Sequence, residues 1–269
     1  MNDITDKEFR QIRDHIKDKY GISLNDEKKS LVYSRLRTVL AEHGFTNFSQ
    51  YFDYLVSDKT GQAAISFVDR ITTNHTYFMR ESAHFDFLRD TALPQVEGLI
   101  PDKDLRVWCA ASSSGEEPYT LQIIIEEFFR DKPGWNTETL ATDISSKVLA
   151  KAVQGVYANE SVMLLPPEWR NKYFRKSGES NMAVADEVKK KLTFRIFNLM
   201  EEKFPFKKPF HIIFARNVMI YFDNETRDAL VRRFYDFIVD GGYLFIGHSE
   251  SLSHTDTKFK YVMPAVYRK

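Results

Sequence analysis

The stretch CAASSSGEEPYT, residues 109–120, is the strongest indication in this sequence of an α/β fold. It follows a short apolar strand pattern over 105–109 and leads into apolar residues at helical spacing from Leu121 to Phe128. A strand, a loop of small residues and a helix are typical of α/β domains that bind a nucleotide-like ligand. The small residues let the backbone approach the ligand, and the helix N-terminus offers free N–H groups.

Two carboxylates, Glu116 and Glu117, distinguish this loop from phosphate-binding loops, which carry glycines and a lysine. Acidic side chains repel phosphate, but they suit a ligand that carries an ammonium or a sulfonium group. The loop therefore favours S-adenosylmethionine over a dinucleotide or ATP. The sequence leaves open which of the two carboxylates contacts this cofactor.

Composition narrows the class of protein. A length of 269 residues predicts roughly two domains. The 38 Lys and Arg residues balance 38 Asp and Glu residues, which gives no support for a nucleic-acid partner. The only cysteine, Cys109, excludes an intrachain disulfide, and the histidines lack H-E-x-x-H spacing, so we expect no metal. The polar N-terminus and the absence of a long apolar run predict a cytoplasmic protein without membrane insertion.

The first 71 residues predict an all-helical N-terminal domain, because their apolar positions recur at helical spacing and no strand pattern interrupts them. Its helices are expected at 6–20, at about 25–43, at 48–56 and at 63–71. Residues 72–92 then form an interdomain segment, in which a non-periodic stretch leads into a helix over 82–91, with Pro94 beyond that helix.

Residues 93–269 predict a Rossmann-like α/β domain, because strand and helix patterns alternate and so favour a largely parallel sheet. Asp240-Gly241-Gly242 is expected to form the turn before one strand, and an antiparallel β insert is expected at about 170–197. The expected strands are 105–110, 138–142, 193–197, 210–215, 243–247 and 262–267, and the expected helices are 117–130, 146–153 and 224–238.

Polar residues gather where strands of this predicted sheet end. Asp143 ends the strand ETLATD, where an acidic residue can accept the ribose hydroxyls of an adenosine or cap the following helix. Arg216 and Asn217 follow a buried strand at the edge where open α/β sheets bind ligands. His248, in GHSES, suggests hydrolase chemistry only weakly, because the chain has no G-x-S-x-G nucleophile turn.

Three motifs occur in order along the chain: NHTYFMRE at 74–81, ASSSGEEPY at 111–119 and RNVMIYFD at 216–223. Together they resemble the chemotaxis receptor glutamate methyltransferases, the CheR family, and the helical N-terminal domain matches in kind. The resemblance implies S-adenosylmethionine-dependent methylation of receptor glutamate carboxylates, which gives glutamate methyl esters and S-adenosylhomocysteine. Two alternatives are a non-catalytic protein that binds the same cofactor or its product for regulation, and a carboxyl methyltransferase of another signalling protein.

The resemblance also implies roles for individual residues. Glu117 would face the methionine end of the cofactor, Asp143 the ribose, and Arg80 with Tyr221 the reacting carboxylate. Asn198 and Leu199 would flank the adenine, and Ala215 and Arg216 would lie beneath it. The full set of cofactor contacts implied by the family is Asn74, Thr76, Arg80, Glu117, Asp143, Asn198, Leu199, Ala215 and Arg216.

The expected partner is the cytoplasmic helical domain of chemotaxis receptors, bound by a monomer of this chain. Lys28 and Arg35, in the predicted helix at 25–43, are the residues we assign to substrate docking. Arg37 points to the other side of that helix at 100° per residue, and an ordinary solvated surface is an equal alternative for any one of these cations. The β insert resembles a subdomain that in some family members binds a receptor tail, and the sequence leaves tail binding open.

Overall fold

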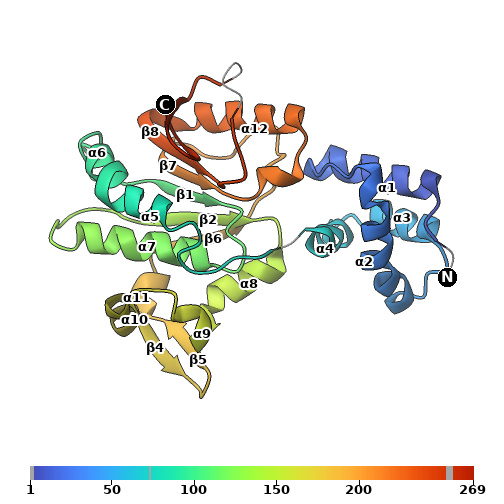
Figure 1. Cartoon of the computed structure of the whole chain (residues 1–269), viewed down its shortest axis with the longest axis horizontal. Helices are drawn as coiled ribbons and strands as arrows, with labels where there is room; N and C mark the ends of the chain where they lie inside the picture. The colour runs from blue at the N-terminus through green and yellow to red at the C-terminus, as the bar shows by residue number, and fades with distance from the viewer. Residues whose placement is uncertain (1–2, 73, 253–256) are drawn as a thin grey trace. The chain divides into compact units, whose positions relative to one another are not determined.

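The computed structural model describes residues 3–72, 74–252 and 257–269 (Figure 1). The chain divides into two units. The first contains residues 1–74 and a short later segment, 221–226, and the second contains 75–220 and 227–269.

The first unit is helical, as the sequence predicts. Helix α1 begins at a capping box, in which the Thr5 hydroxyl accepts the Glu8 backbone N–H and the Glu8 carboxylate accepts the Thr5 backbone N–H. The helix ends at Gly21, which has a φ of +71°. A 3₁₀ turn, η1 (Asp26–Lys28), precedes α2, so the helix that we expected from residue 25 starts with a tighter turn. The helices are α1 (Asp6–Tyr20), α2 (Lys29–Glu42), α3 (Phe48–Ser57) and α4 (Gln62–Ile71).

The later segment, 221–226, is joined to this helical unit by a backbone bridge and an ion pair among its described contacts. The Ser23 N–H donates to the Tyr221 carbonyl oxygen at 2.8 Å, and Ile22 forms an antiparallel bridge with Phe222. Lys17 and Asp223 form an ion pair at 2.7 Å, which lowers the pKa of Asp223 to about 2 through a hydrogen bond with Lys17. The backbone of Tyr221 is therefore fixed within the first unit.

The second unit is built on a seven-stranded sheet of order β6-β2-β1-β7-β8-β10-β9. The first five strands are parallel, and β10 and β9 add to the edge as an antiparallel pair. Strands β1 and β7 are completely buried, which explains their continuous apolar sequence. The strands are β1 (Val107–Ala110), β2 (Thr139–Asp143), β6 (Leu192–Ile196), β7 (Phe210–Ala215), β8 (Ile238–Ile246), β9 (Lys260–Met263) and β10 (Val266–Arg268).

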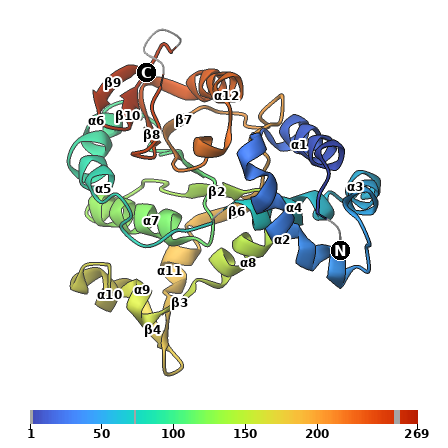
Figure 2. The same cartoon turned by 45° about the vertical axis from the view of Figure 1, so that its right-hand side comes forward.

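Helices cover both faces of this sheet, with α7 and α12 on opposite faces in Figures 1 and 2. The helix that we expected to end near residue 91 continues through a π turn, because Pro94 lies in the first turn of the next helix, where its missing N–H costs nothing. The elements are α5 (Ala83–Phe87), the π turn η2 (Leu88–Ala92), α6 (Leu93–Glu97), α7 (Glu116–Phe129), α8 (Ser146–Gln154) and α12 (Asn224–Asp236).

Two strand predictions at the C-terminal end were wrong in detail. Residues 240–242 lie inside β8 instead of forming a turn before it, where the pairing with β7 shifts register and Gly241 has a φ of +83°. The single strand that we expected over 262–267 is the hairpin of β9 and β10, which turns at Ala265 with a φ of +62°.

The small antiparallel sheet has the order β3-β5-β4 and extends away from the main sheet (Figure 2). The observed sheet differs from the insert that we expected at 170–197. Its first strand lies before residue 170, and β6, at the C-terminal end of the expected insert, pairs with β2 in the main sheet instead. The elements are β3 (Val156–Ala158), α9 (Asn159–Val162), α10 (Pro167–Tyr173), β4 (Phe174–Ser177), β5 (Asn181–Val184) and α11 (Asp186–Lys189).

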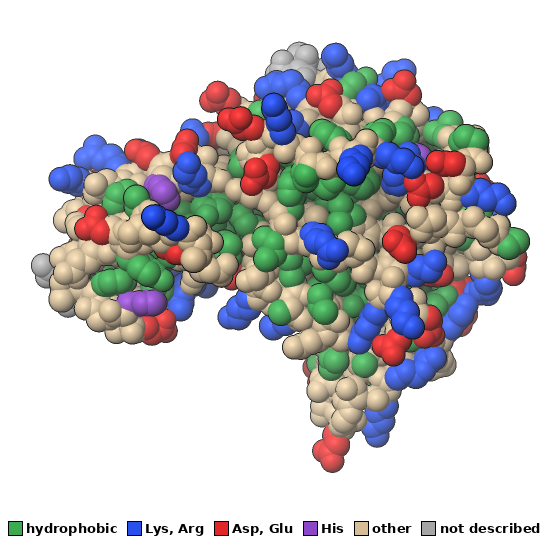
Figure 3. Space-filling view, turned by 180° about the vertical axis from the view of Figure 1, so that it is seen from behind, with side chains coloured by type: hydrophobic (Ala, Val, Ile, Leu, Met, Phe, Trp, Pro, Cys, Tyr) green, Lys and Arg blue, Asp and Glu red, His purple; other side chains and the backbone are tan. Residues whose placement is uncertain are grey.

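The hydropathy of the helices and the charges on the surface agree with the balanced charge and moderate apolar content of the sequence. Among the described residues, none of the helices has the length and apolar character needed to cross a membrane. On the face that Figure 3 shows, basic and acidic side chains are interspersed instead of forming one basic stripe.

Candidate active site

The strand order of the main sheet reverses between β1 and β7, since the chain moves outward from β1 to β2 and β6 and then returns to the other side of β1. Open α/β sheets bind ligands beyond the carboxyl ends of the strands at such a reversal. The loop 111–115 follows β1, Asp143 ends β2, and Arg216 follows β7. These three segments therefore meet at one edge of the sheet.

The loop after β1 requires a glycine at its last position. Gly115 precedes α7 with a φ of +102°, and a Cβ atom there would lie 2.6 Å from the Tyr157 hydroxyl oxygen and 2.9 Å from Ala152 Cβ. Ala111 and Ser113 also have positive φ values, which cost energy in residues with a side chain. The loop is therefore held in a fixed and partly strained shape above β1.

Asp143 joins this loop to β2. Its carboxylate accepts the Ser113 N–H at 2.8 Å with one oxygen and the Ser145 N–H at 3.0 Å with the other. The side chain that caps α8 is Ser145, which accepts the Val148 N–H, so Asp143 is not the helix cap. Asp143 is half-buried, and it orients the loop from the strand end where a ribose would bind.

The two carboxylates of the loop have different surroundings. The Ser114 hydroxyl donates to Glu116 at 2.8 Å, within the loop itself. Glu117 lies 2.9 Å from a guanidinium nitrogen of Arg216, and the Cys109 thiol donates to its other oxygen at 3.3 Å. Burial raises the pKa of both carboxyl groups, and Arg216 opposes this effect at Glu117. Glu117 is thus the carboxylate that belongs to the buried charge cluster.

Arg216 is the centre of that cluster, with a side chain that is 0% exposed. One guanidinium nitrogen lies 3.1 Å from Glu81 and also donates to the Arg80 carbonyl oxygen. Its Nε and its second terminal nitrogen find no hydrogen-bond acceptor among the described residues, because the contact with Glu117 is close but poorly aligned. Two buried N–H donors without an acceptor are costly unless a ligand completes them.

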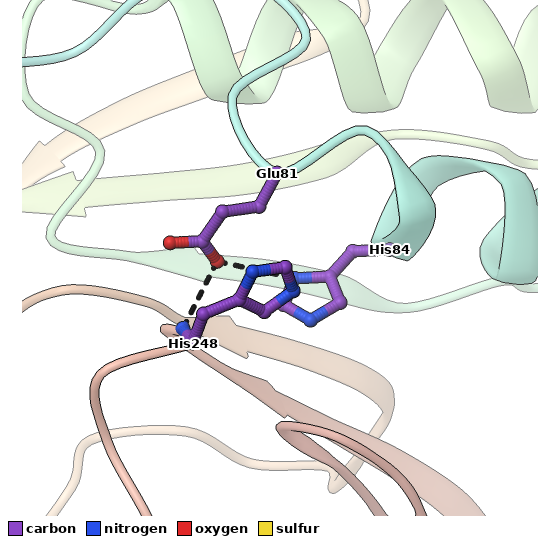
Figure 4. A group of neighbouring side chains, drawn as sticks. All are labelled: Glu81, His84 and His248. Atoms are coloured by element: carbon purple, nitrogen blue, oxygen red, sulfur yellow. Dashed lines mark hydrogen bonds and ion pairs between the residues drawn. The ribbon is translucent and has the colours of Figure 1, made fainter.

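Glu81 also contacts two histidines (Figure 4). The His248 backbone N–H donates to Glu81 at 3.1 Å, and the Nδ1 atom of the buried His84 lies 3.5 Å from the same carboxylate oxygen. Burial, with the nearby charge of Arg216, lowers the pKa of His84 to about 4, so its ring is neutral at neutral pH. Ligand atoms of Glu81, His84 and His248 lie within 4.8 Å of one another, a separation that a metal site could span.

Comparison with known proteins agrees with this geometry. The model of the CheR methyltransferase all-alpha domain matches residues 7–72, and that of the CheR methyltransferase SAM-binding domain matches 74–267. The chain belongs to the CheR methyltransferase family. Family membership makes it a methyltransferase that binds S-adenosylmethionine, and it confirms the fold class predicted from the sequence.

Curated relatives extend over nearly the whole chain. A chemotaxis protein methyltransferase of Borreliella burgdorferi is 40% identical over 99% of this chain and 95% of its own length. The chemotaxis protein methyltransferase of Escherichia coli is 37% identical over 98% of this chain and 91% of its own length. A probable chemotaxis protein methyltransferase of Rhizobium etli is 38% identical over 87% of this chain and 88% of its own length.

The residues of the site fit the cofactor of this family. A carboxylate is the acceptor that best satisfies a guanidinium, and the methionine end of S-adenosylmethionine carries one. The same end carries an ammonium group, which the partly paired Glu117 can accept. The fit therefore rests on two open buried donors of Arg216 and on the half-buried carboxylate of Glu117 beside them.

The structure distributes the residues predicted for the site over both units. Asn74, Tyr221, Lys28 and Arg35 belong to the first unit, and the other predicted residues belong to the second. In the second unit, Glu117, Arg216 and the backbone of Arg80 are in contact, and Ala215 is buried at the end of β7. Asn198 and Leu199 follow β6, where Asn198 accepts the Met200 N–H at 2.9 Å and Leu199 is buried. Thr76 is half-buried.

Sequence reasoning assigned no role to two carboxylates near Arg216, the half-buried Glu81 and the buried Glu250. Glu81 closes the first motif and pairs with Arg216 and Asn217. Glu250 accepts the backbone N–H groups of Asn217, Ile220 and Gly247, and so fixes the loop after β7. Apart from Gly247, these partners lie far away along the chain, and the only signal in the sequence was the position of Glu81 inside a recognised motif.

Proposed function

We propose that this chain methylates glutamate side-chain carboxylates of chemotaxis receptors, giving glutamate methyl esters and S-adenosylhomocysteine. The family and the names of the curated relatives support this substrate class. The observation that carries the proposal is the pair of the buried Arg216 and the half-buried Glu117 at the strand-order reversal, which suits the amino-acid end of the methyl donor. We further propose that the protein acts in the cytoplasm as a monomer.

The proposed cofactor contacts follow the family's motifs. Glu117 accepts the ammonium group, and Asp143 accepts the ribose hydroxyls while it holds the loop through Ser113. Arg216 was assigned a place beneath the adenine, but its contact with Glu117 supports a place beside the methionine end. The remaining proposed contacts are Asn74, Thr76, Arg80, Asn198, Leu199 and Ala215.

The chemistry needs no dedicated base. A glutamate carboxylate, with a reference pKa of about 4.3, is already ionised at neutral pH. S-adenosylmethionine supplies an electrophilic methyl group on its sulfonium. The residues of the chain hold the carboxylate oxygen in line with that methyl group, and such placement contributes roughly 7–11 kcal/mol in well-oriented systems. We assign the alignment to the Arg80 guanidinium and the Tyr221 hydroxyl.

Arg80 has a contact that supports this assignment. Its guanidinium donates to the His75 carbonyl oxygen at 2.6 Å, which directs the side chain back along its own segment. Its neighbours Met79 and Glu81 both have φ values near +60°, so the backbone around Arg80 is tightly curved. A residue held in this way loses little further freedom when it binds a carboxylate.

Docking of the receptor is proposed for the helical unit. Arg35 is exposed on α2, and Lys28 ends the turn that precedes this helix. Lys29, by contrast, is paired with Asp6 at 2.5 Å, which makes it less available to an acidic partner. We propose that Lys28 and Arg35 meet acidic side chains on the helical cytoplasmic domain of the receptor.

The experiment that tests this function uses labelled methyl donor. The full chain is incubated with labelled S-adenosylmethionine and receptor cytoplasmic fragments, and base-labile methyl esters are measured. Fragments with glutamine in place of their glutamates serve as the control and should stay unlabelled. Tight cofactor binding without labelled fragment would refute the proposal and favour the regulatory alternative. Label only in another signalling protein would favour the second alternative.

A further inference from the structure

Glu81 contacts Arg216, Asn217 and His248, although no role in cofactor binding or catalysis has been assigned to it. Its side chain is 14% exposed, and its two oxygens contact Arg216 at 3.1 Å, the Asn217 side-chain amide at 3.3 Å and the His248 N–H at 3.1 Å. The left-handed backbone of Glu81, with a φ of +56°, turns the carboxylate toward these groups. A carboxylate held from several elements at once is a fixed part of the site.

The group of Glu81, His84 and His248, whose ligand atoms lie close enough for a metal site, does not favour a metal ion. The carboxylate oxygen that faces both histidines is also the one that contacts the Arg216 guanidinium. A divalent cation bound there would displace or face a buried positive charge, which a low-dielectric interior makes costly. The geometry points to Arg216 as the cation for which Glu81 is placed.

Arg216 lies between two carboxylates: one of its terminal nitrogens is 3.1 Å from Glu81, and the other is 2.9 Å from Glu117. Burial is the largest effect on Glu81 and acts to raise its pKa, but Arg216, the Asn217 side chain and His248 together outweigh burial, and the pKa is lowered. At Glu117 burial is the stronger effect, and the pKa stays raised although Arg216 opposes it. The nitrogen on the Glu81 side also donates to the Arg80 carbonyl oxygen, whereas the nitrogen on the Glu117 side makes no aligned hydrogen bond within the described part of the chain.

We propose that Glu81 is a positioning residue: it holds the Arg216 guanidinium out of full pairing with Glu117, so that Glu117 stays available to the ammonium group of the methyl donor. The poorly aligned contact between Arg216 and Glu117 is the geometric sign of this arrangement. Without the charge of Glu81, Arg216 would pair fully with Glu117 and compete with the ligand. This inference rests on the proposed role of Glu117.

The test compares two ligands and three substitutions. S-adenosylmethionine carries the ammonium and carboxylate groups, whereas 5′-methylthioadenosine lacks the amino-acid end. Glu81→Gln keeps the size of the side chain and removes its charge. We expect it to weaken S-adenosylmethionine binding about tenfold, as for loss of a charged hydrogen bond, and to leave 5′-methylthioadenosine within about twofold. Affinities are measured by calorimetry on the full chain.

Glu250→Gln is the matched control, because Glu250 is a buried carboxylate of the same unit whose partners are backbone N–H groups. It should leave the ratio of the two affinities as in the unsubstituted chain. An unchanged ratio in Glu81→Gln would overturn the inference, as would an equal change in both glutamine variants.

Glu117→Gln separates this inference from the function on which it rests. If Glu117→Gln leaves the ratio unchanged, the proposed role of Glu117 fails, and the inference fails with it. If Glu117→Gln lowers the ratio and Glu81→Gln does not, only the inference fails. Should Glu81→Gln not fold, the pair Glu81→Asp and Glu81→Asn gives the same charge contrast at a shorter length. Equal ratios in that pair would then overturn the inference.

Discussion

The buried His84 predicts a specific loss of stability in acid. Its ordinary pKa is 6.5 and its pKa in the folded protein is about 4, because burial and the charge of Arg216 disfavour the protonated ring. A histidine with a lowered folded pKa contributes stability that is complete above pH 6.5 and is lost as the pH falls toward 4. Between these two pH values, His84 is protonated in the unfolded chain but not in the folded protein.

The size of this effect follows from linkage. Each pH unit in the window costs about 1.4 kcal/mol for one proton. At pH 5, one and a half units below the ordinary pKa of 6.5, His84 should therefore lower the free energy of unfolding by about 2 kcal/mol relative to pH 8. His84→Gln lacks this titration, and the difference in unfolding free energy between pH 8 and pH 5 should shrink by about 2 kcal/mol.

The assay is urea unfolding followed by tryptophan fluorescence at both pH values. The three tryptophans, Trp108, Trp135 and Trp169, all lie in the second unit with His84, so the signal reports on that unit alone. Any loss of packing in His84→Gln is common to both pH values and cancels in the difference, as do the carboxylates that titrate in both chains. An equal pH dependence in the two chains would refute the reasoning.

Three further substitutions test the proposed reaction and its scaffold. Tyr221→Phe should lower kcat about tenfold, equivalent to ~1.4 kcal/mol, with less effect on the Kd for cofactor, and equal losses in both would contradict the alignment role. Gly115→Ala should destabilise the second unit by at least about 2 kcal/mol in urea unfolding, since it adds a left-handed alanine and two clashes, and a smaller loss would show that the loop can relax. Arg35→Glu should raise the KM for receptor fragments several-fold at an unchanged cofactor Kd, with Arg37→Glu on the other side of α2 as the matched control.

The sequence predicted the elements that local patterns specify. Continuous apolar runs marked the buried strands β1 and β7, and the loop of small residues before α7 marked the ligand edge of the sheet. Glu117 was found because the chemistry of that loop departs from phosphate binding. These signals are short-range, so one sequence suffices to read them.

The features that the sequence did not predict depend on tertiary context. The helix after residue 82 was expected to end before Pro94, but a π turn and the free first turn of α6 accommodate the proline. The two glycines at 241–242 indicated a turn, whereas the register shift between β7 and β8 places them within a strand. Glu81 meets Arg216 and His248 only after three distant segments have folded together.

The division of the chain assigns most residues of each proposed function to one unit. Glu117, Asp143 and Arg216 belong to the second unit, where Arg216 contacts Glu117 and Asp143 accepts an N–H from the loop after β1. Tyr221 belongs to the first unit, with α2 and the residues proposed for docking, and its backbone is fixed there by Ser23. Substitutions in the first unit should therefore act on receptor KM and on kcat, whereas substitutions at the buried charge cluster should act first on cofactor affinity. Asn74 is the proposed exception, because it is a cofactor contact carried by the first unit.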